Sequence, residues 1–159
     1  MAAGLAVMVA TMSRGKKAYL QYESQLSAAI ARLAPLREEL KAAIDADAES
    51  YNSVMKAYKQ ARSEADEQAA EARIESAIKE ATSVPLTVAE KAYAVAQLAQ
   101  SLAPITNPNM KSDLATAVAL ARAAIAGALA NVEINLSALK DQAFAAHVRQ
   151  RTAALLEAE

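Results

Sequence analysis

The chain has 159 residues, a length that suits one domain with a hydrophobic core, and its 17 basic and 18 acidic residues give a formal net charge of −1. Basic residues gather only at Arg14, Lys16 and Lys17, so we expect no nucleic-acid partner. The absence of cysteine excludes disulfides and thiol chemistry. The single histidine, His147, excludes the usual histidine-cluster metal site, so we expect no bound metal.

Alanine dominates the composition. Hydrophobic residues make up 54% of the chain and aromatic residues 4%, and about a quarter of all residues are alanine. Alanine is the best helix former and lets helices approach closely, which predicts an all-α protein. Because only 3 Gly and 4 Pro interrupt the chain, the helices should be few and long.

The first 12 residues are apolar, which is too short a stretch to cross a bilayer. No basic region precedes them, so they make a poor signal peptide. We therefore expect a buried helix over Ala2–Met12, no membrane partner and a cytoplasmic location. Gly15 should end this helix. Lys16 and Lys17 follow at the turn, either as a solvated pair or as a clamp for an anion.

Two long helices come next. The second helix is predicted over Tyr22–Lys59 with Pro35 inside it, and the third over Glu64–Leu102 with Pro85 inside it. A proline within a helix removes one backbone hydrogen bond, so each helix should kink at its proline. The polar segment between them is the predicted loop.

Asp47 interrupts one face of the second helix. Residues spaced four and three apart form an apolar stripe there: Leu26, Ile30, Leu33, Leu40, Ile44, Tyr51, Val54 and Tyr58, broken by Arg37 and Asp47. A lone carboxylate facing a core loses several kcal/mol of solvation (about 2 or more) unless it is partnered. Asp47 is thus either a boundary residue paired with a neighbouring helix or a carboxylate held in a pocket for a cationic or proton-transferring substrate.

The segment from Pro104 to Asn109 predicts a turn before the fourth helix, with Ser112 or Asn109 as its cap and Asp113 in its first turn. Gly127 in the middle of this helix suggests a close contact with a helix or a ligand. Asn131 and Asn135 on the same face would need hydrogen-bond partners if buried, in a helix–helix contact or a ligand pocket.

A fifth helix should begin at Asp141. We therefore predict a single domain over residues 1–159, an elongated antiparallel bundle of about five helices, two of them long and kinked by proline. The Ala-rich faces suit contacts between two copies, so we also predict a homodimer.

The order of several short motifs resembles that of a known family. The motifs are Gly15 with Lys16, Lys17 and Tyr19; Asp45-Ala-Asp47-Ala-x-x-Tyr51; Ala57-x-Lys59; Val84-Pro85-Leu86 with Ala89-Glu90; Asn107 with Ser112-Asp113-Leu114; and Gly127-x-x-x-Asn131-Val132-x-Ile134-Asn135-Leu136. Together they resemble the cyclodeaminase domain of formimidoyltransferase-cyclodeaminase and the related methenyltetrahydrofolate cyclohydrolases. Each motif is weak alone, but their shared order is specific.

The resemblance implies an all-helical, dimeric enzyme that acts on one-carbon tetrahydrofolates. Its substrate would be a tetrahydrofolate derivative, with no permanently bound cofactor. It would close 5-formiminotetrahydrofolate to 5,10-methenyltetrahydrofolate with loss of ammonia, or open the methenyl ring with water. The matching carboxylates, Asp47 and Asp113, are the expected catalytic residues. The expected substrate-binding residues are Lys16, Lys17, Lys59, Asn107, Ser112 and Asn131.

The sequence departs from the family at two places. Relatives have a Gly-Gly-Gly-Ser loop ahead of the first helix, and we expect this chain to lack it. The Leu-Pro that usually follows Lys59 is replaced by Gln60-Ala61-Arg62. The alternative to an enzyme is therefore a non-catalytic helical dimerisation module, a degenerate relative of the family.

Overall fold

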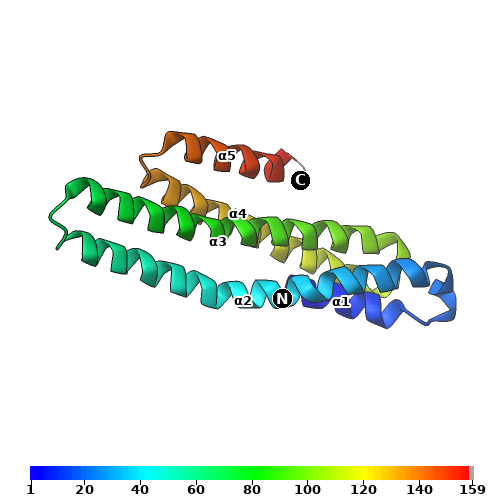
Figure 1. The fold of residues 1–159 in the computed structure, drawn as a ribbon. Coiled ribbons are helices and arrows are strands. Elements are labelled where there is room, and N and C mark those ends of the chain that lie inside the picture. Colours follow the sequence, from blue (N-terminus) through cyan, green and yellow to red (C-terminus); the bar gives the residue numbers. More distant parts are fainter. Residues whose placement is uncertain (158–159) are drawn as a thin grey trace. The chain divides into compact units, whose positions relative to one another are not determined.

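The computed structural model describes residues 1–157, which form five α-helices and three short 3-10 helices without a β-strand. The α-helices are α1 (Ala2–Ser13), α2 (Glu23–Ala61), α3 (Glu67–Leu102), α4 (Lys111–Ser137) and α5 (Gln142–Glu157) (Figure 1). The 3-10 helices are η1 (Lys17–Tyr22), η2 (Ala103–Ile105) and η3 (Pro108–Met110). The prediction of an all-α protein with two long helices is confirmed, and Pro35 and Pro85 lie inside α2 and α3.

The helices form two compact units. Unit 1 comprises Met1–Lys41 and Lys91–Ile125, and unit 2 comprises Ala42–Glu90 and the chain from Ala126 onward. Each of the long helices α2, α3 and α4 therefore contributes one part to each unit.

The core of unit 1 is built largely from alanine and leucine. Its fully buried side chains include Ala6, Val9 and Ala10 of α1, Leu26 and Leu33 of α2, Val95, Ala99 and Leu102 of α3, and Ala117 of α4. Small side chains at helix contacts let the helix axes approach closely, so the alanines of α1 allow this short apolar helix to be covered by its neighbours. The N-terminal stretch is thus a buried helix, as predicted.

The core of unit 2 joins α3, α4 and α5. It contains Ile78 and Leu86 of α3, Val132 and Leu136 of α4, Leu139, and Ala145 and Val148 of α5. Asp141 begins α5 as predicted, because its Oδ1 accepts a hydrogen bond of 2.9 Å from the backbone N–H of Phe144.

Helix α4 is both long and apolar. With the turn before it, Pro108–Ser137 is long and apolar enough to cross a membrane by length and composition, with a mean hydropathy of 1.5. One side of α4 supplies Leu114 and Ile125 to unit 1 and Val132 to unit 2, all buried. Of the apolar window in this segment, 28% is buried inside the structure, so packing within the described chain accounts for only part of its hydropathy.

The start of α4 differs from its predicted start. Asn107 accepts a hydrogen bond of 3.0 Å from the backbone N–H of Asn109 and so caps η3, after which α4 begins directly at Lys111. Neither Asn109 nor Ser112 is the cap. Prolines at positions 104 and 108 produce the two short 3-10 helices in place of one simple turn.

Candidate functional site

The eight residues predicted for the site fall into both units. Lys16, Lys17, Asn107, Ser112 and Asp113 belong to unit 1, and Asp47, Lys59 and Asn131 belong to unit 2.

In unit 1, buried Ser13 joins the two turns that carry the predicted residues. Its hydroxyl donates to the carbonyl of Val9 over 2.9 Å and accepts from the backbone N–H of Asn107 over 3.1 Å. The carbonyl of Ser13 also accepts the backbone N–H of Lys16 over 3.3 Å. Lys16 and Asn107 therefore share one hydrogen-bonding partner, although they lie 91 positions apart in the sequence. This junction brings the turn after α1 against the turn before α4.

Gly15 shapes the turn that carries the lysines. Its φ of 72° lies in the left-handed region, which glycine adopts without steric cost. The backbone N–H of Gly15 donates to Oε2 of Glu23 over 2.8 Å and so fixes the turn to the start of α2. Lys16 and Lys17 are exposed, and neither forms an ion pair within the described part of the chain. Both ammonium groups are therefore available to an anion.

Asp113 lies half-buried in the first turn of α4. The N-terminus of a helix carries a partial positive charge, so an acidic residue at this place stabilises the helix. The Asp113 side chain forms no ion pair with any of residues 1–157. Ser112 beside it is exposed, and its carbonyl accepts the hydroxyl of Thr116 over 2.8 Å. Unit 1 thus presents a carboxylate without a cationic partner on the same helix turn as an exposed serine.

The prediction that one apolar stripe faces the core along the whole of α2 is wrong. Leu26 and Leu33 are buried in unit 1, but Ile44 and Tyr51 are 71% and 64% exposed in unit 2. In unit 2, α2 turns a different face inward, made of small or medium residues: Ala43, Ala46, Ser50, Val54 and Ala57. Alanine packs as closely as leucine against a neighbouring helix, so side-chain size alone did not reveal which face is inside.

Asp47 is consequently exposed in the isolated chain. Its backbone carbonyl accepts the hydroxyl of Ser50 over 2.8 Å, whereas its carboxylate forms no ion pair with residues 1–157. The pairing with a neighbouring helix that the sequence left open is not found within these residues. Lys59 and Asn131 are exposed as well.

Gly127 has no close neighbour in the chain. A Cβ placed on it would meet nothing within 4 Å, so the close contact expected from the sequence is absent within the described residues.

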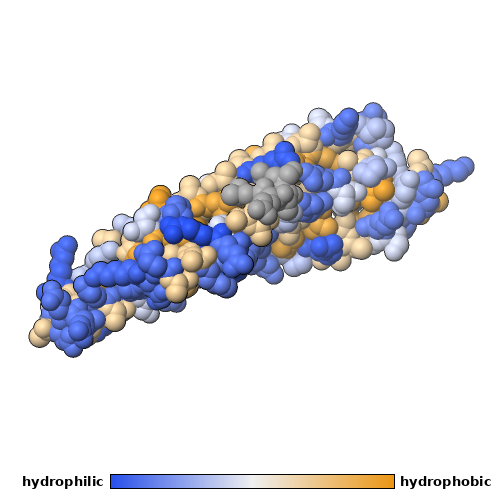
Figure 2. All heavy atoms as spheres, turned by 90° about the horizontal axis from the view of Figure 1, so that it is seen from above, coloured by the Kyte–Doolittle hydropathy of each residue, from blue (hydrophilic) through white to orange (hydrophobic). Residues whose placement is uncertain are grey.

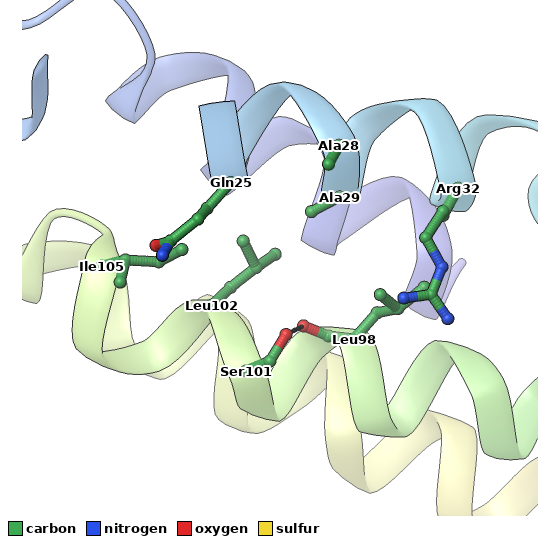
Figure 3. Close-up of a pocket in the computed structure, with 8 residues that line it drawn as sticks. All are labelled: Gln25, Ala28, Ala29, Arg32, Leu98, Ser101, Leu102 and Ile105. Carbon is green, nitrogen blue, oxygen red and sulfur yellow. Dashed lines mark hydrogen bonds between the residues drawn. The ribbon is translucent and has the colours of Figure 1, made fainter. Parts of the chain in front are cut away.

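Three cavities lie inside single units, and none of the three is lined by a residue predicted for the site. The largest of them, about 400 Å³, lies in unit 1 between α2 and α3 (Figure 3). Its floor is apolar, with Ala29, Leu98 and Leu102 buried, and its exposed rim carries Gln25, Arg32 and Ser101. This cavity could not be predicted from the sequence, because its two walls come from segments far apart in the chain.

A cluster of charged side chains around Lys79 and Asp141 stabilises unit 2. Nζ of Lys79 on α3 lies 2.7 Å from Oδ2 of Asp141, and Oε1 of Glu75 accepts the backbone N–H of Asp141 over 2.7 Å. The hydrogen bond from Lys79, together with that from the Phe144 backbone, lowers the pKa of Asp141, and the same carboxylate raises the pKa of Lys79. Lys79 also lies 5.6 Å above the Phe144 ring. These contacts fasten the start of α5 to α3.

No group of three histidine, cysteine, aspartate or glutamate side chains within residues 1–157 could hold a metal ion. Hydrophobic patches interrupt the hydrophilic surface in the space-filling view (Figure 2). Among the exposed large apolar side chains are Ile44, Tyr51, Met55 and Tyr58 of α2.

A family model described as formiminotransferase-cyclodeaminase matches residues 1–154 of the chain. The chain is 34% identical over 156 residues to formimidoyltransferase-cyclodeaminase of Gallus gallus, covering 98% of this chain and 29% of that protein. It is 36% identical over 146 residues to methenyltetrahydrofolate cyclohydrolase of Methylorubrum extorquens, covering 91% of this chain and 70% of that protein. The chain therefore spans less than a third of the first relative and over two thirds of the second.

The fold is also similar to a solved structure. The crystal structure of formiminotetrahydrofolate cyclodeaminase from Thermotoga maritima aligns with a TM-score of 0.88 at 31% identity, covering 99% of this chain and 77% of that one.

Proposed function

Because the chain belongs to the formiminotransferase-cyclodeaminase family, we propose that it is an enzyme acting on one-carbon tetrahydrofolates. The observation that carries the proposal is the family match, which runs over residues 1–154. Similar proteins are named for two related reactions, cyclodeaminase and methenyltetrahydrofolate cyclohydrolase. The reaction is therefore ring closure of 5-formiminotetrahydrofolate with loss of ammonia, or hydrolytic opening of 5,10-methenyltetrahydrofolate.

A protein can assist both reactions in the same two ways, by stabilising positive charge and by transferring protons. Each passes through a carbon bonded to two nitrogens that carries positive charge, and each moves protons. In ring closure, N10 attacks the formimino carbon, the leaving nitrogen takes up a proton, and its bond to carbon breaks. In ring opening, water adds to the methenyl carbon, and the bond from this carbon to N5 breaks as N5 takes up a proton. A carboxylate can stabilise the cationic carbon and pass on the proton.

We assign these tasks to Asp47 and Asp113. Neither carboxylate is engaged by a lysine or an arginine within residues 1–157, so both remain free to interact with a cationic reaction centre. For the anionic tail of the folate we propose the exposed Lys16, Lys17 and Lys59.

We propose that polar contacts to the substrate come from Asn107, Ser112 and Asn131. The junction at Ser13 supports part of this assignment, since it holds the backbone of Asn107 and of Lys16 together. One substrate could therefore contact both turns of unit 1.

The working form is proposed to be a homodimer. The exposed apolar side chains Ile44, Tyr51, Met55 and Tyr58 of α2 support this proposal, because exposed apolar side chains gathered on one helix are typical of protein–protein contacts.

The test is turnover of a methenyl substrate. Methenyltetrahydrofolate absorbs in the near ultraviolet, and its loss is followed with and without the protein. Release of ammonia from 5-formiminotetrahydrofolate is measured in parallel to separate the two reactions. The chain is assayed as it stands and with a Gly-Gly-Gly-Ser segment added before Met1. Acceleration over buffer by either version supports the proposal. Failure of both versions to accelerate either reaction would favour the non-catalytic dimerisation module.

A further inference from the structure

The cavity of about 400 Å³ between α2 and α3 in unit 1 arises from the size of a few side chains. Each wall consists of four residues with the spacing i, i+3, i+4 and i+7, which places them on one face of their helix. The walls are Gln25, Ala28, Ala29 and Arg32 on α2, and Leu98, Ser101, Leu102 and Ile105 on α3. Because the two middle positions of α2 are alanines, their side chains leave the space opposite the leucines of α3 unfilled.

The cavity combines an apolar floor with a polar group at each end. Leu98 and Leu102 on the floor are 6% and 0% exposed. Gln25 and Arg32 lie about two helical turns apart on α2. In Figure 3, the side chain of Gln25 extends towards Ile105, and that of Arg32 extends towards α3. Apolar walls with a small number of polar groups are typical of a site for a small molecule.

The guanidinium group of Arg32 is the charged group of this cavity, and it is not engaged. Neither Arg32 nor the side-chain amide of Gln25 has an ion pair or a hydrogen bond within residues 1–157. The hydroxyl of Ser101, in contrast, already donates to the carbonyl of Leu98 over 2.8 Å. A guanidinium group binds a carboxylate through two parallel hydrogen bonds, so the free donor at this end of the cavity suits a carboxylate.

The carboxylates of unit 1 do not compete for Arg32. Asp113 forms no ion pair among the described residues, and the other three acidic residues of the unit have different partners. Glu23 pairs with Arg14, Glu38 with Arg37 and Lys41, and Glu39 with Lys91.

The charge of unit 1 also favours an anion. The unit contains nine basic and four acidic residues, a surplus of five positive charges, although the formal net charge of the whole chain is −1. A surface of one sign raises the local concentration of ions of the opposite sign. The cavity should therefore prefer an anion to an uncharged molecule of the same shape.

We propose that the cavity between α2 and α3 binds a small organic acid, with its apolar body against Leu98 and Leu102 and its carboxylate on the guanidinium group of Arg32. Gln25 closes the other end about 10 Å away along α2, which limits the acid to about the length of a substituted benzoate. None of the eight residues predicted for the candidate site lines this cavity, so the proposal does not require the chain to be an enzyme.

Calorimetric titration with 4-methylbenzoate tests the proposal, and 4-methylbenzamide is the uncharged molecule of the same shape. We expect one benzoate to bind to each chain, and the amide to bind at least about tenfold more weakly. Arg32→Gln should weaken binding of the benzoate to the level of the amide. Ala28→Phe should abolish binding, because the ring fills the cavity from an exposed position and leaves the buried floor unchanged.

The matched control is Arg122→Gln, which removes the same charge from an exposed position of α4 in unit 1, outside the cavity. It should bind the benzoate as the wild type does. Circular dichroism checks that the three variants are folded. The proposal is overturned if the wild type does not bind the benzoate, if the amide binds equally well, if Arg32→Gln or Ala28→Phe keeps the wild-type affinity, or if the control loses it.

A ring with a nearby carboxylate occurs in free organic acids and also in the p-aminobenzoylglutamate part of a folate, a source that rests on the proposed function. Displacement of bound 4-methylbenzoate by p-aminobenzoylglutamate would identify the folate part as the ligand, and continued binding of the benzoate would identify a free acid. Turnover is measured separately. Binding without turnover would count against the proposed function alone, and turnover without binding would count against the cavity alone.

Discussion

Ser13 and Asn107 are joined by a hydrogen bond of 3.1 Å, from the backbone N–H of Asn107 to the Ser13 hydroxyl, across 94 positions of the sequence. The same hydroxyl donates to the carbonyl of Val9, so it links α1 to the turn before α4. Because Ser13 is completely buried, water cannot replace it in either contact. The arrangement of the candidate residues in unit 1 therefore depends on a serine that the motifs did not include.

Replacement of Ser13 by alanine should lower the free energy of unfolding by about 1–2 kcal/mol, since the N–H of Asn107 loses its partner. Chemical denaturation measures this change. The control is Ser63→Ala, which removes only an exposed local hydrogen bond to Gln60 and should have little effect. Equal stability of the two variants would mean that the junction does not hold the turns together.

A substitution at Gly127 in α4 should change the free energy of unfolding. An alanine at this position meets nothing within 4 Å. Gly127→Ala should therefore raise the free energy of unfolding by about 0.5–1 kcal/mol, the usual gain in helix propensity. Gly4→Ala, near the start of α1, is the comparison with a smaller expected gain. If Gly127→Ala instead weakens association between copies of the chain, α4 contacts a partner at this position. The glycine then permits the close helix contact expected from the sequence.

The contact between Lys79 and Asp141 predicts a pH dependence of stability. The pKa of Asp141 is lowered in the folded state by the Lys79 hydrogen bond and by the Phe144 backbone N–H. The contribution of this carboxylate is thus fully present above its unfolded pKa of about 3.9, and it is lost as pH falls through the lower folded value. Asp141→Asn retains the cap and removes the charge. Its deficit in stability relative to the wild type should be larger at about pH 6 than at about pH 3.

Asp66→Asn is the matched control for this titration. Asp66 also caps a helix, accepting the backbone N–H of Gln68 over 2.9 Å, but it pairs with no lysine among the described residues. Unfolding by denaturant at several pH values measures both variants. A deficit of Asp141→Asn that is equal at both pH values would show that the ion pair does not stabilise the fold.

Local signals in the sequence located most of the helices. Asp141 was identified as the start of α5 because a short acidic side chain there can accept backbone N–H groups, and the structure has that hydrogen bond. The cap of α4 was misplaced because Asn107, Asn109 and Ser112 all have suitable side chains. The choice among them depends on how two prolines arrange the backbone before the helix.

The faces of α2 could not be predicted in the same way. One continuous helix belongs to two units, and its buried face changes from Leu26 and Leu33 to Ala46 and Ala57. A periodic pattern reports which residues share a face, but it does not report which face meets another helix. The exposure of Tyr51 is thus a property of tertiary packing and of any partner that covers it.

The assignment of Asp47 and Asp113 as catalytic residues makes a direct functional prediction. Asp47→Asn and Asp113→Asn each keep the size of the side chain and remove the titrating group. We expect each to lower kcat by at least about 100-fold, as loss of a general acid or base does. Asp47 is exposed, so its variant should keep the wild-type stability within about 0.5 kcal/mol. Glu67→Gln, an exposed carboxylate at the start of α3, is the control that should keep full turnover.

The turnover of each variant separates the two roles. Full turnover of Asp47→Asn in an active protein would make Asp47 a surface residue without a catalytic role. Full turnover of Asp113→Asn would in the same way exclude Asp113 from the reaction and leave it as an acidic residue that stabilises the N-terminus of α4.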